Sequence, residues 1–201
     1  QGGRENGKGG IRHAGNGNGE DGEGQPFDAA RGGMLIWPAS RFVAGEEKES
    51  AIAVVRELNA RGISASLDLL GENATERDAA VRACDDYVNL LRGIADARVD
   101  SNISIKLTML GLDIEPGLAR DQLVSILETA RDTDNFVRID MEGSPYTQLT
   151  LELFYEVWKS FRNVGVVIQS MLRRSVADID RLITEGARVR LVKGAYKKPA
   201  P

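Results

Sequence analysis

Two short runs, Ile103-Ser-Ile-Lys-Leu-Thr108 and Phe136-Val-Arg-Ile-Asp-Met-Glu142, decide the fold of this chain. Each is rich in β-branched residues, has the length of a buried strand and ends in charged side chains. The first run contains Lys106 near its end, and the second contains Asp140 and Glu142 near its end. Charged groups at the ends of buried strands are typical of a barrel whose strand ends line an active site. The two runs therefore predict a catalytic architecture.

The pattern of strand, charged loop and amphipathic helix continues on both sides of this stretch. Strands are expected at 41–44 (short), 63–70, 103–108, 136–141, 164–171 and 188–193, and helices at 46–61, 75–94, 118–131, 147–162 and 176–185. Thr75 is expected to cap the second of these helices, whose apolar face would include Val81 and Tyr87. Strands that alternate with amphipathic helices imply right-handed βαβ units and a parallel sheet.

Two parallel architectures fit this alternation. An open doubly wound sheet usually carries a Gly-rich turn after its first strand, and Phe42-Val-Ala-Gly-Glu46 is a poor match. Polar residues instead recur where strand after strand ends: Asp68 and Glu72, Lys106, Asp140 and Glu142, Gln169, Arg190 and Lys193. A complete barrel typically needs about 250 residues, and this chain has 201. The sequence predicts an α/β fold, a (β/α)8 TIM-type barrel that is incomplete, with about six strands.

The chain divides into two parts by composition. Residues 1–33 hold 12 of the 22 glycines and almost no large apolar side chain. Such a segment cannot bury enough surface to offset its chain entropy, so it is expected to be disordered. The partial barrel is expected over residues 34–201.

Bulk composition excludes several function classes. The net charge of −4 comes without a basic cluster, which argues against a nucleic-acid partner. The single cysteine, Cys84, lies in a helical stretch and is expected to be a packing residue. The single histidine, His13, leaves no Ser/His/Asp triad and no histidine metal cluster, so no metal site is expected. No apolar run approaches the length of a membrane span and no signal-peptide core is present, so a cytoplasmic location is expected.

Five side chains could carry chemistry. Lys106 could pair with a substrate carboxylate or form a Schiff base, or it could simply hold neighbouring strands through an ion pair with Asp140. Asp140 and Glu142 lie two residues apart and would share one face of a regular strand. One of these carboxylates is expected to be the partner of Lys106. Arg188 and Arg190 also share a face, which favours an anionic ligand over solvated strand ends.

Six segments together resemble the proline dehydrogenases, flavin-dependent barrel enzymes that oxidise L-proline. They appear in the family's order and spacing over residues 41–196: Arg41-Phe-Val-Ala-Gly45, Leu67-Asp-Leu-Leu-Gly-Glu72, Ser104-Ile-Lys-Leu-Thr108, Ile139-Asp-Met-Glu-Gly-Ser144, Val166-Val-Ile-Gln169 with Leu172-Arg-Arg-Ser175, and Arg190-Leu-Val-Lys-Gly-Ala-Tyr196.

The resemblance implies a function and a role for each site residue. The expected reaction is oxidation of L-proline to Δ1-pyrroline-5-carboxylate, with hydride transfer to noncovalently bound FAD. Lys106 would contact the proline carboxylate, and Asp140 would orient Lys106 and close the site. Gln169, Arg190 and Lys193 would contact the flavin, with Arg190 near its reducible nitrogen. The family usually passes electrons to a membrane quinone, which implies a peripheral membrane contact at the inner face of a membrane.

The chain also departs from the family pattern. The last strands and the closing helix, which in the family supply a Tyr and an Arg pair that clamp the substrate, do not occur before Pro201. Weak or absent turnover by this chain alone is therefore expected. Two alternatives stay open: a Schiff-base aldolase that uses Lys106 or Lys193, and a non-catalytic barrel remnant or subunit whose open sheet edges seek a partner.

Overall fold

The computed structural model describes residues 47–71 and 73–194. The expected disordered segment 1–33, the expected start of the barrel near Met34 and the short strand at 41–44 lie outside these residues. The described elements are α2 (Lys48–Ala60), β1 (Ala65–Asp68), α3 (Arg77–Ala97), β2 (Ser101–Ile105), α4 (Pro116–Asp132), β3 (Val137–Ile139), the 3-10 helix η1 (Ser144–Tyr146), α5 (Thr147–Trp158), β4 (Val164–Gln169), α6 (Ser175–Thr184) and β5 (Arg188–Val192).

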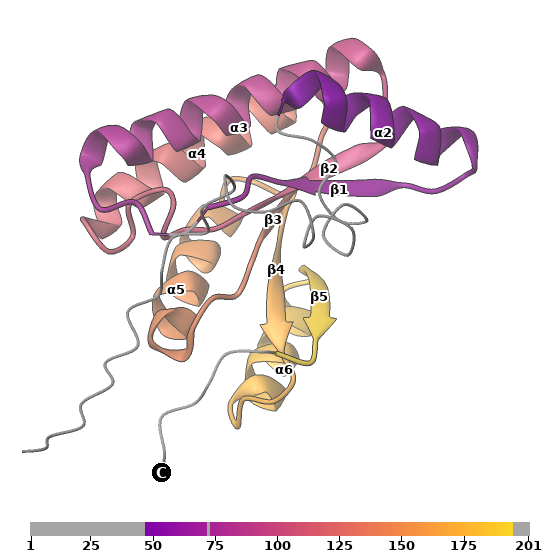
Figure 1. Ribbon diagram of the computed structural model, residues 1–201. Helices are drawn as coiled ribbons and strands as arrows, with labels where there is room; N and C mark the ends of the chain where they lie inside the picture. Colours follow the sequence, from indigo (N-terminus) through magenta and orange to yellow (C-terminus); the bar gives the residue numbers. More distant parts are fainter. Residues whose placement is uncertain (1–46, 72, 195–201) are drawn as a thin grey trace, which may run out of the picture.

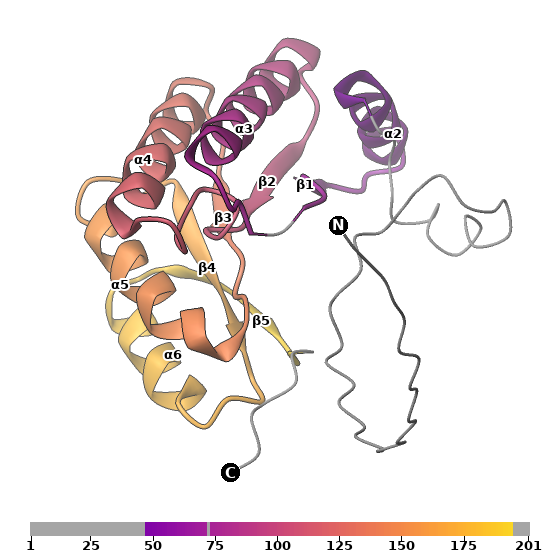
Figure 2. The same cartoon turned by 60° about the vertical axis from the view of Figure 1, so that its left-hand side comes forward.

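The five strands form one parallel sheet whose spatial order is the order of the sequence, β1-β2-β3-β4-β5. Helices connect consecutive strands, as the βαβ prediction required (Figure 1). Figure 2 shows the strands following one another around an arc, with α3, α4, α5 and α6 on its outer side. A parallel sheet that curls in this way, with helices only outside, is part of a (β/α)8 barrel. The predicted fold class is confirmed.

The alternation of side chains along the strands separates an apolar outer face from a polar inner face. Ile103, Ile105, Val137 and Ile139 have no exposed surface and belong to the core between the sheet and the helices. The residues between them are polar: Ser104 on β2 and Arg138 on β3. Because successive residues of a strand point to opposite faces, these polar side chains face the inside of the arc. The barrel interior is therefore where chemistry can be placed.

The core takes in aromatic residues of α5 and the single cysteine. The aromatic residues of α5 form a core stripe, with Phe154 fully buried and Trp158 only 6% exposed. Phe161, just after the helix, is buried as well. Cys84 packs in the core between α3 and its neighbours, as expected for an inert cysteine.

Two predictions about α3 are wrong. The helix begins after Glu76, which makes no capping hydrogen bond through its side chain, so Thr75 is not the cap. Val81 is 40% exposed, whereas Ala80, one residue earlier, is fully buried. Each residue turns a helix by about 100°, so an apolar residue next to the buried stripe can face solvent.

Gly165 in β4 marks a position where the strand has no room for a side chain. A Cβ there would lie 2.5 Å from the backbone oxygen of Arg188 and 2.8 Å from Cζ of Phe136. We expect Gly165→Ala to lower the free energy of unfolding by about 1–3 kcal/mol, because the backbone of β5 or the ring of Phe136 must move. Urea denaturation followed by circular dichroism measures the change.

The matched control is Gly117→Ala in the first turn of α4. The only close neighbour of a Cβ at Gly117 is a side-chain oxygen of Glu115, at an ordinary distance of 3.5 Å. Alanine is also the better helix former, so this variant should be as stable as the parent or slightly more stable. Equal stability of both variants would contradict the account of Gly165.

Candidate functional site at the carboxyl ends of the strands

The predicted site residues gather at one end of the sheet. Lys106 directly follows β2, Asp140 directly follows β3, and Gln169 ends β4. Asp68 ends β1, and Arg190 lies in the middle of β5. Parallel strands bring their carboxyl ends to the same edge, so five separate parts of the sequence meet at one mouth of the arc.

Lys106 pairs with Asp68, not with Asp140. Its Nζ lies 2.6 Å from Oδ2 of Asp68, and the two side chains are only 16% and 31% exposed. The register places Asp68 of β1 opposite Ser104 of β2, two residues before Lys106. The sequence prediction that Asp140 or Glu142 is the ion-pair partner of Lys106 is therefore wrong, because the neighbouring strand on the other side supplies the carboxylate.

The surroundings of Lys106 favour its charged form. Burial acts to lower the pKa of Lys106, but the hydrogen bond and charge of Asp68, with the charges of Asp140 and Glu142, outweigh it and raise the pKa above its usual value. A protonated ammonium suits the pairing with a carboxylate. A Schiff base needs the neutral amine as nucleophile. The electrostatics of the site thus oppose the aldolase alternative.

Asp140 and Arg190 form a second unit on the inner face. The Nη1 of Arg190 lies 3.9 Å from Oδ1 of Asp140 and donates a hydrogen bond of 3.1 Å to Oγ of Ser104. Arg190 thereby reaches from β5 to β2 across the inside of the arc. Burial and the charge of Asp68 raise the pKa of Asp140, while Lys106 and Arg190 lower it. Burial prevails, so the pKa of Asp140 lies above its usual value.

Glu142 has a different role from Asp140. Its carboxylate accepts hydrogen bonds from the backbone N–H of Thr108, at 3.1 Å, and from the Thr108 hydroxyl, at 2.5 Å. Both residues are buried. Strand β3 ends at Ile139, so the regular alternation that would put Asp140 and Glu142 on one face does not extend to them. Glu142 joins the loops after β2 and β3, and the expectation that Asp140 and Glu142 share one face of a regular strand is not met.

The buried position of Glu142 predicts a pH-dependent stability. Burial raises the pKa of Glu142 above its usual 4.5, against the opposing hydrogen bonds from Thr108. The folded state then holds this proton more tightly than the unfolded state, so the associated stability is present below about pH 4.5 and is lost as the pH rises through the folded-state pKa. Glu142→Gln cannot ionise. As the pH rises through the folded-state pKa, the free energy of unfolding of the parent should therefore fall relative to that of this variant.

Urea denaturation at a series of pH values between roughly 4 and 7 measures this difference. Glu128→Gln, on the exposed side of α4, serves as the control and should follow the parent. A constant difference between Glu142→Gln and the parent at all pH values would contradict the prediction.

The side-chain amide of Gln169 is held by hydrogen bonds through its nitrogen, while its oxygen has no partner among the described residues. Its Nε2 donates to the backbone oxygens of Met141, at 2.9 Å, and Glu142, at 3.3 Å. Its Oε1 is buried and has no hydrogen-bond partner among the described residues. Lys193, by contrast, is exposed at the end of the described chain. The amide orientation fixed by the β3 loop thus leaves an acceptor at the mouth for an N–H group of a ligand.

Sequence reasoning missed two residues of this inner face. Asp68 was recognised only as a polar strand end, although it is the partner of Lys106. Ser104 was not considered, although it links Arg190 to β2 and lies 3.3 Å from Oγ of Ser66. Ser104 stands two residues before Lys106, so the period of two along a strand was a signal that could have placed it on the same face.

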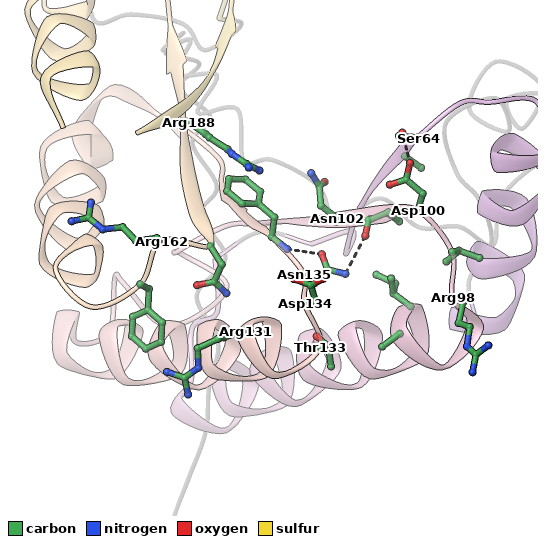
Figure 3. A pocket seen from close by; sticks show the side chains of 18 of the residues that line it. Ser64, Arg98, Asp100, Asn102, Arg131, Thr133, Asp134, Asn135, Arg162 and Arg188 are labelled. Atoms are coloured by element: carbon green, nitrogen blue, oxygen red, sulfur yellow. Dashed lines mark hydrogen bonds between the residues drawn. The ribbon is translucent and has the colours of Figure 1, made fainter. Parts of the chain in front are cut away.

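A cavity of about 950 Å³ lies at the opposite end of the strands and is not this site. Asn102 at the start of β2, Asn135 before β3 and Arg188 at the start of β5 line it (Figure 3). Asn135 spans the strand starts through hydrogen bonds to the backbone of Ser101 and Phe136. Residues at the amino ends of barrel strands generally serve stability. Of the predicted ligand-binding residues only Arg188 lies here, where its guanidinium faces the ring of Phe136, 4.9 Å from the ring centre.

The part of the chain that the structure describes holds neither a cluster of metal ligands nor a membrane-spanning helix. No group of three or more His, Cys, Asp or Glu side chains is arranged to hold a metal ion there. None of the described helices combines the length and the apolar character needed to cross a bilayer.

A curled parallel sheet with an apolar outside and charged strand ends defines a barrel of the (β/α)8 enzyme class. Within that class the sequence is specific: the profile of the proline dehydrogenase family matches residues 51–199, and the chain belongs to this family.

Individual members of this family are similar to the chain in sequence. Proline dehydrogenase 1 of Bacillus subtilis subsp. natto is 39% identical over 162 residues, and proline dehydrogenase of Deinococcus radiodurans is 36% identical over 167 residues. Each match covers 81% of this chain and 54% of the relative, so the chain spans about half the length of these proteins.

The fold is also similar to that of a solved structure. The crystal structure of proline utilization A from Bdellovibrio bacteriovorus, inactivated by N-propargylglycine, superposes with a TM-score of 0.71 at 27% identity. That match covers 80% of this chain and 20% of the larger protein.

Proposed function

We propose that this chain, within a complete barrel, oxidises L-proline to Δ1-pyrroline-5-carboxylate in proline catabolism, with FAD as the hydride acceptor. The observation that carries the proposal is the arrangement of Lys106, Asp68 and Arg190 at the mouth of a barrel that belongs to this family. A fixed ammonium and a guanidinium, both mostly surrounded by protein, suit a substrate with a carboxylate and a cofactor that gains negative charge.

Lys106 is proposed to bind the carboxylate of L-proline. Its pKa is raised, so the ammonium is charged at neutral pH. Only one of its three N–H donors is needed for Asp68, which leaves donors for the substrate. Asp140, beside Lys106 and Arg190, is proposed to close the site and to keep both cations in place through its charge.

Gln169, Arg190 and Lys193 are proposed to hold FAD. The buried, unpartnered Oε1 of Gln169 can accept a hydrogen bond from a ring N–H, and its amide is already fixed by two backbone oxygens. The guanidinium of Arg190 is anchored to Ser104 and Asp140 and offers further donors. FAD, when bound, accepts the hydride of proline. The protein contributes position and positive charge, and the described residues fit both tasks.

The visible spectrum of the chain with FAD tests this proposal. The chain alone should bind FAD but show little or no bleaching when L-proline is added without oxygen, because it spans only about half the length of its relatives. A completed barrel, in which the closing strands of a relative follow this chain, should bleach. Absence of FAD binding in both proteins would contradict the proposal.

Two finer proposals concern the electron acceptor and location. We propose a membrane quinone as the acceptor, which requires a peripheral contact between a cytoplasmic protein and the inner face of a membrane. Reoxidation of the reduced completed barrel by a soluble ubiquinone analogue, faster than by oxygen, is the expected result.

The aldolase alternative makes the opposite chemical prediction. Borohydride treatment with a carbonyl substrate should trap a covalent adduct on Lys106 if a Schiff base forms. We expect no adduct, because Asp68 keeps this lysine protonated.

A further inference from the structure

The hydroxyl of Tyr87 extends the contacts of Lys106 into the helix layer. Tyr87 lies in α3 and has no exposed surface. Its hydroxyl donates to Oδ1 of Asp68 at 3.3 Å and lies 3.8 Å from Sδ of Met109. The other oxygen of the same carboxylate, Oδ2, accepts the 2.6 Å hydrogen bond from Lys106. One carboxylate therefore joins a buried phenol to the lysine at the barrel mouth.

We propose that Tyr87 is a positioning residue for Lys106: its hydroxyl fixes one oxygen of Asp68 so that the other stays directed at Nζ of Lys106. Asp68 is the link, and Tyr87 itself contacts neither substrate nor cofactor. Only the last step, from the position of Lys106 to the binding of a carboxylate substrate, rests on the proposed function.

Packing alone does not explain a tyrosine at this position. A phenylalanine would bury the same ring, and burying a hydroxyl away from water is costly unless it is hydrogen-bonded. Burial, followed by the charge of Asp68, raises the pKa of Tyr87, so the phenol stays neutral and remains a donor. A buried donor on a helix can hold a carboxylate that is still 31% exposed and could otherwise turn toward water.

Lys106 has other acidic neighbours, and Asp68 must be distinguished from them. Asp140 and Glu142, from the loop after β3, also raise the pKa of Lys106, but only Asp68 makes a hydrogen bond to its side chain among the described residues. Asp140 also faces Arg190, and Glu142 is bound to Thr108. The direction of the Lys106 side chain therefore depends on the orientation of Asp68.

An NMR titration of the chain carrying ¹³C-labelled lysine tests the proposal without cofactor or substrate. The Lys106 signal is identified as the one missing in Lys106→Arg. Asp68→Asn should lower the pKa of Lys106 by about one to three units, because burial is then less compensated. Tyr87→Phe should lower it by a smaller amount, since the carboxylate then spends part of its time turned away.

Tyr155→Phe is the matched control. It removes the same atom from a tyrosine of α5 whose hydroxyl is buried without a partner in the described chain, and it should leave the pKa of Lys106 unchanged. In the double variant Asp68→Asn/Tyr87→Phe, the tyrosine change should have no further effect, because Tyr87 acts through Asp68. Equal effects of Tyr87→Phe with and without Asp68 would overturn the proposal.

A second measurement keeps the test decisive if Tyr87→Phe does not fold. The ¹³Cζ signal of Tyr87 should shift in Asp68→Asn, while that of Tyr155 should not. An unmoved Tyr87 signal would also overturn the proposal.

Measurements of enzyme activity distinguish a failure of this inference from a failure of the proposed function. In the completed barrel, Tyr87→Phe should raise KM for L-proline about 3-fold to 10-fold with little change in kcat, the pattern of lost ground-state binding. NMR effects as expected, without any proline oxidation by the parent, would leave the positioning of Lys106 standing and refute the proposed function.

Discussion

Lys106→Met in a completed barrel is expected to lower kcat/KM for L-proline by roughly 30-fold to 4,000-fold. The range corresponds to the 2–5 kcal/mol that is typically lost when one partner of a buried charge pair is removed. Methionine keeps most of the length of the side chain but removes the ammonium, so the proposed contact with the substrate carboxylate and the ion pair with Asp68 are both lost. Steady-state oxidation of L-proline measures the effect.

Lys159→Met is the control for this prediction. Lys159 is exposed just after α5, and its substitution should leave kcat/KM unchanged. FAD binding should survive in both variants, because Lys106 is assigned to the substrate and not to the cofactor. A Lys106→Met enzyme with parental kcat/KM would contradict the proposed role of this residue.

Arg190→Met is expected to weaken FAD binding and to lower kcat by about 100-fold or more, the usual cost of removing a donor placed beside developing negative charge. The variant also leaves Asp140 without its 3.9 Å partner and Ser104 without its hydrogen bond. Titration with FAD, followed by fluorescence, gives the affinity, and anaerobic mixing with L-proline gives the rate of bleaching.

Arg190→Lys distinguishes the effect of the positive charge at this position from the effect of the planar guanidinium group. It keeps the positive charge but not the planar set of donors that contacts both Ser104 and Asp140, so an intermediate loss is expected. Arg92→Met, on the exposed side of α3, is the control and should behave as the parent. If Arg190→Met binds FAD as tightly as this control, Arg190 is not a cofactor residue.

The sequence by itself determined the order and kind of the elements. Alternation of β-branched runs with amphipathic helices predicted a parallel βαβ fold, because side-chain period follows local backbone geometry. The same local signal placed Lys106, Asp140 and Gln169 at strand ends.

Only the tertiary structure decided which charged groups meet. Lys106 pairs with Asp68, 38 residues away, because the parallel register of β1 and β2 places Asp68 opposite Ser104, two residues before Lys106. Arg190 reaches Ser104, 86 residues away, because the sheet curls. Strand register and curvature are set by the packing of the whole sheet against its helices, and sequence periodicity contains no information about the distance between two strand ends.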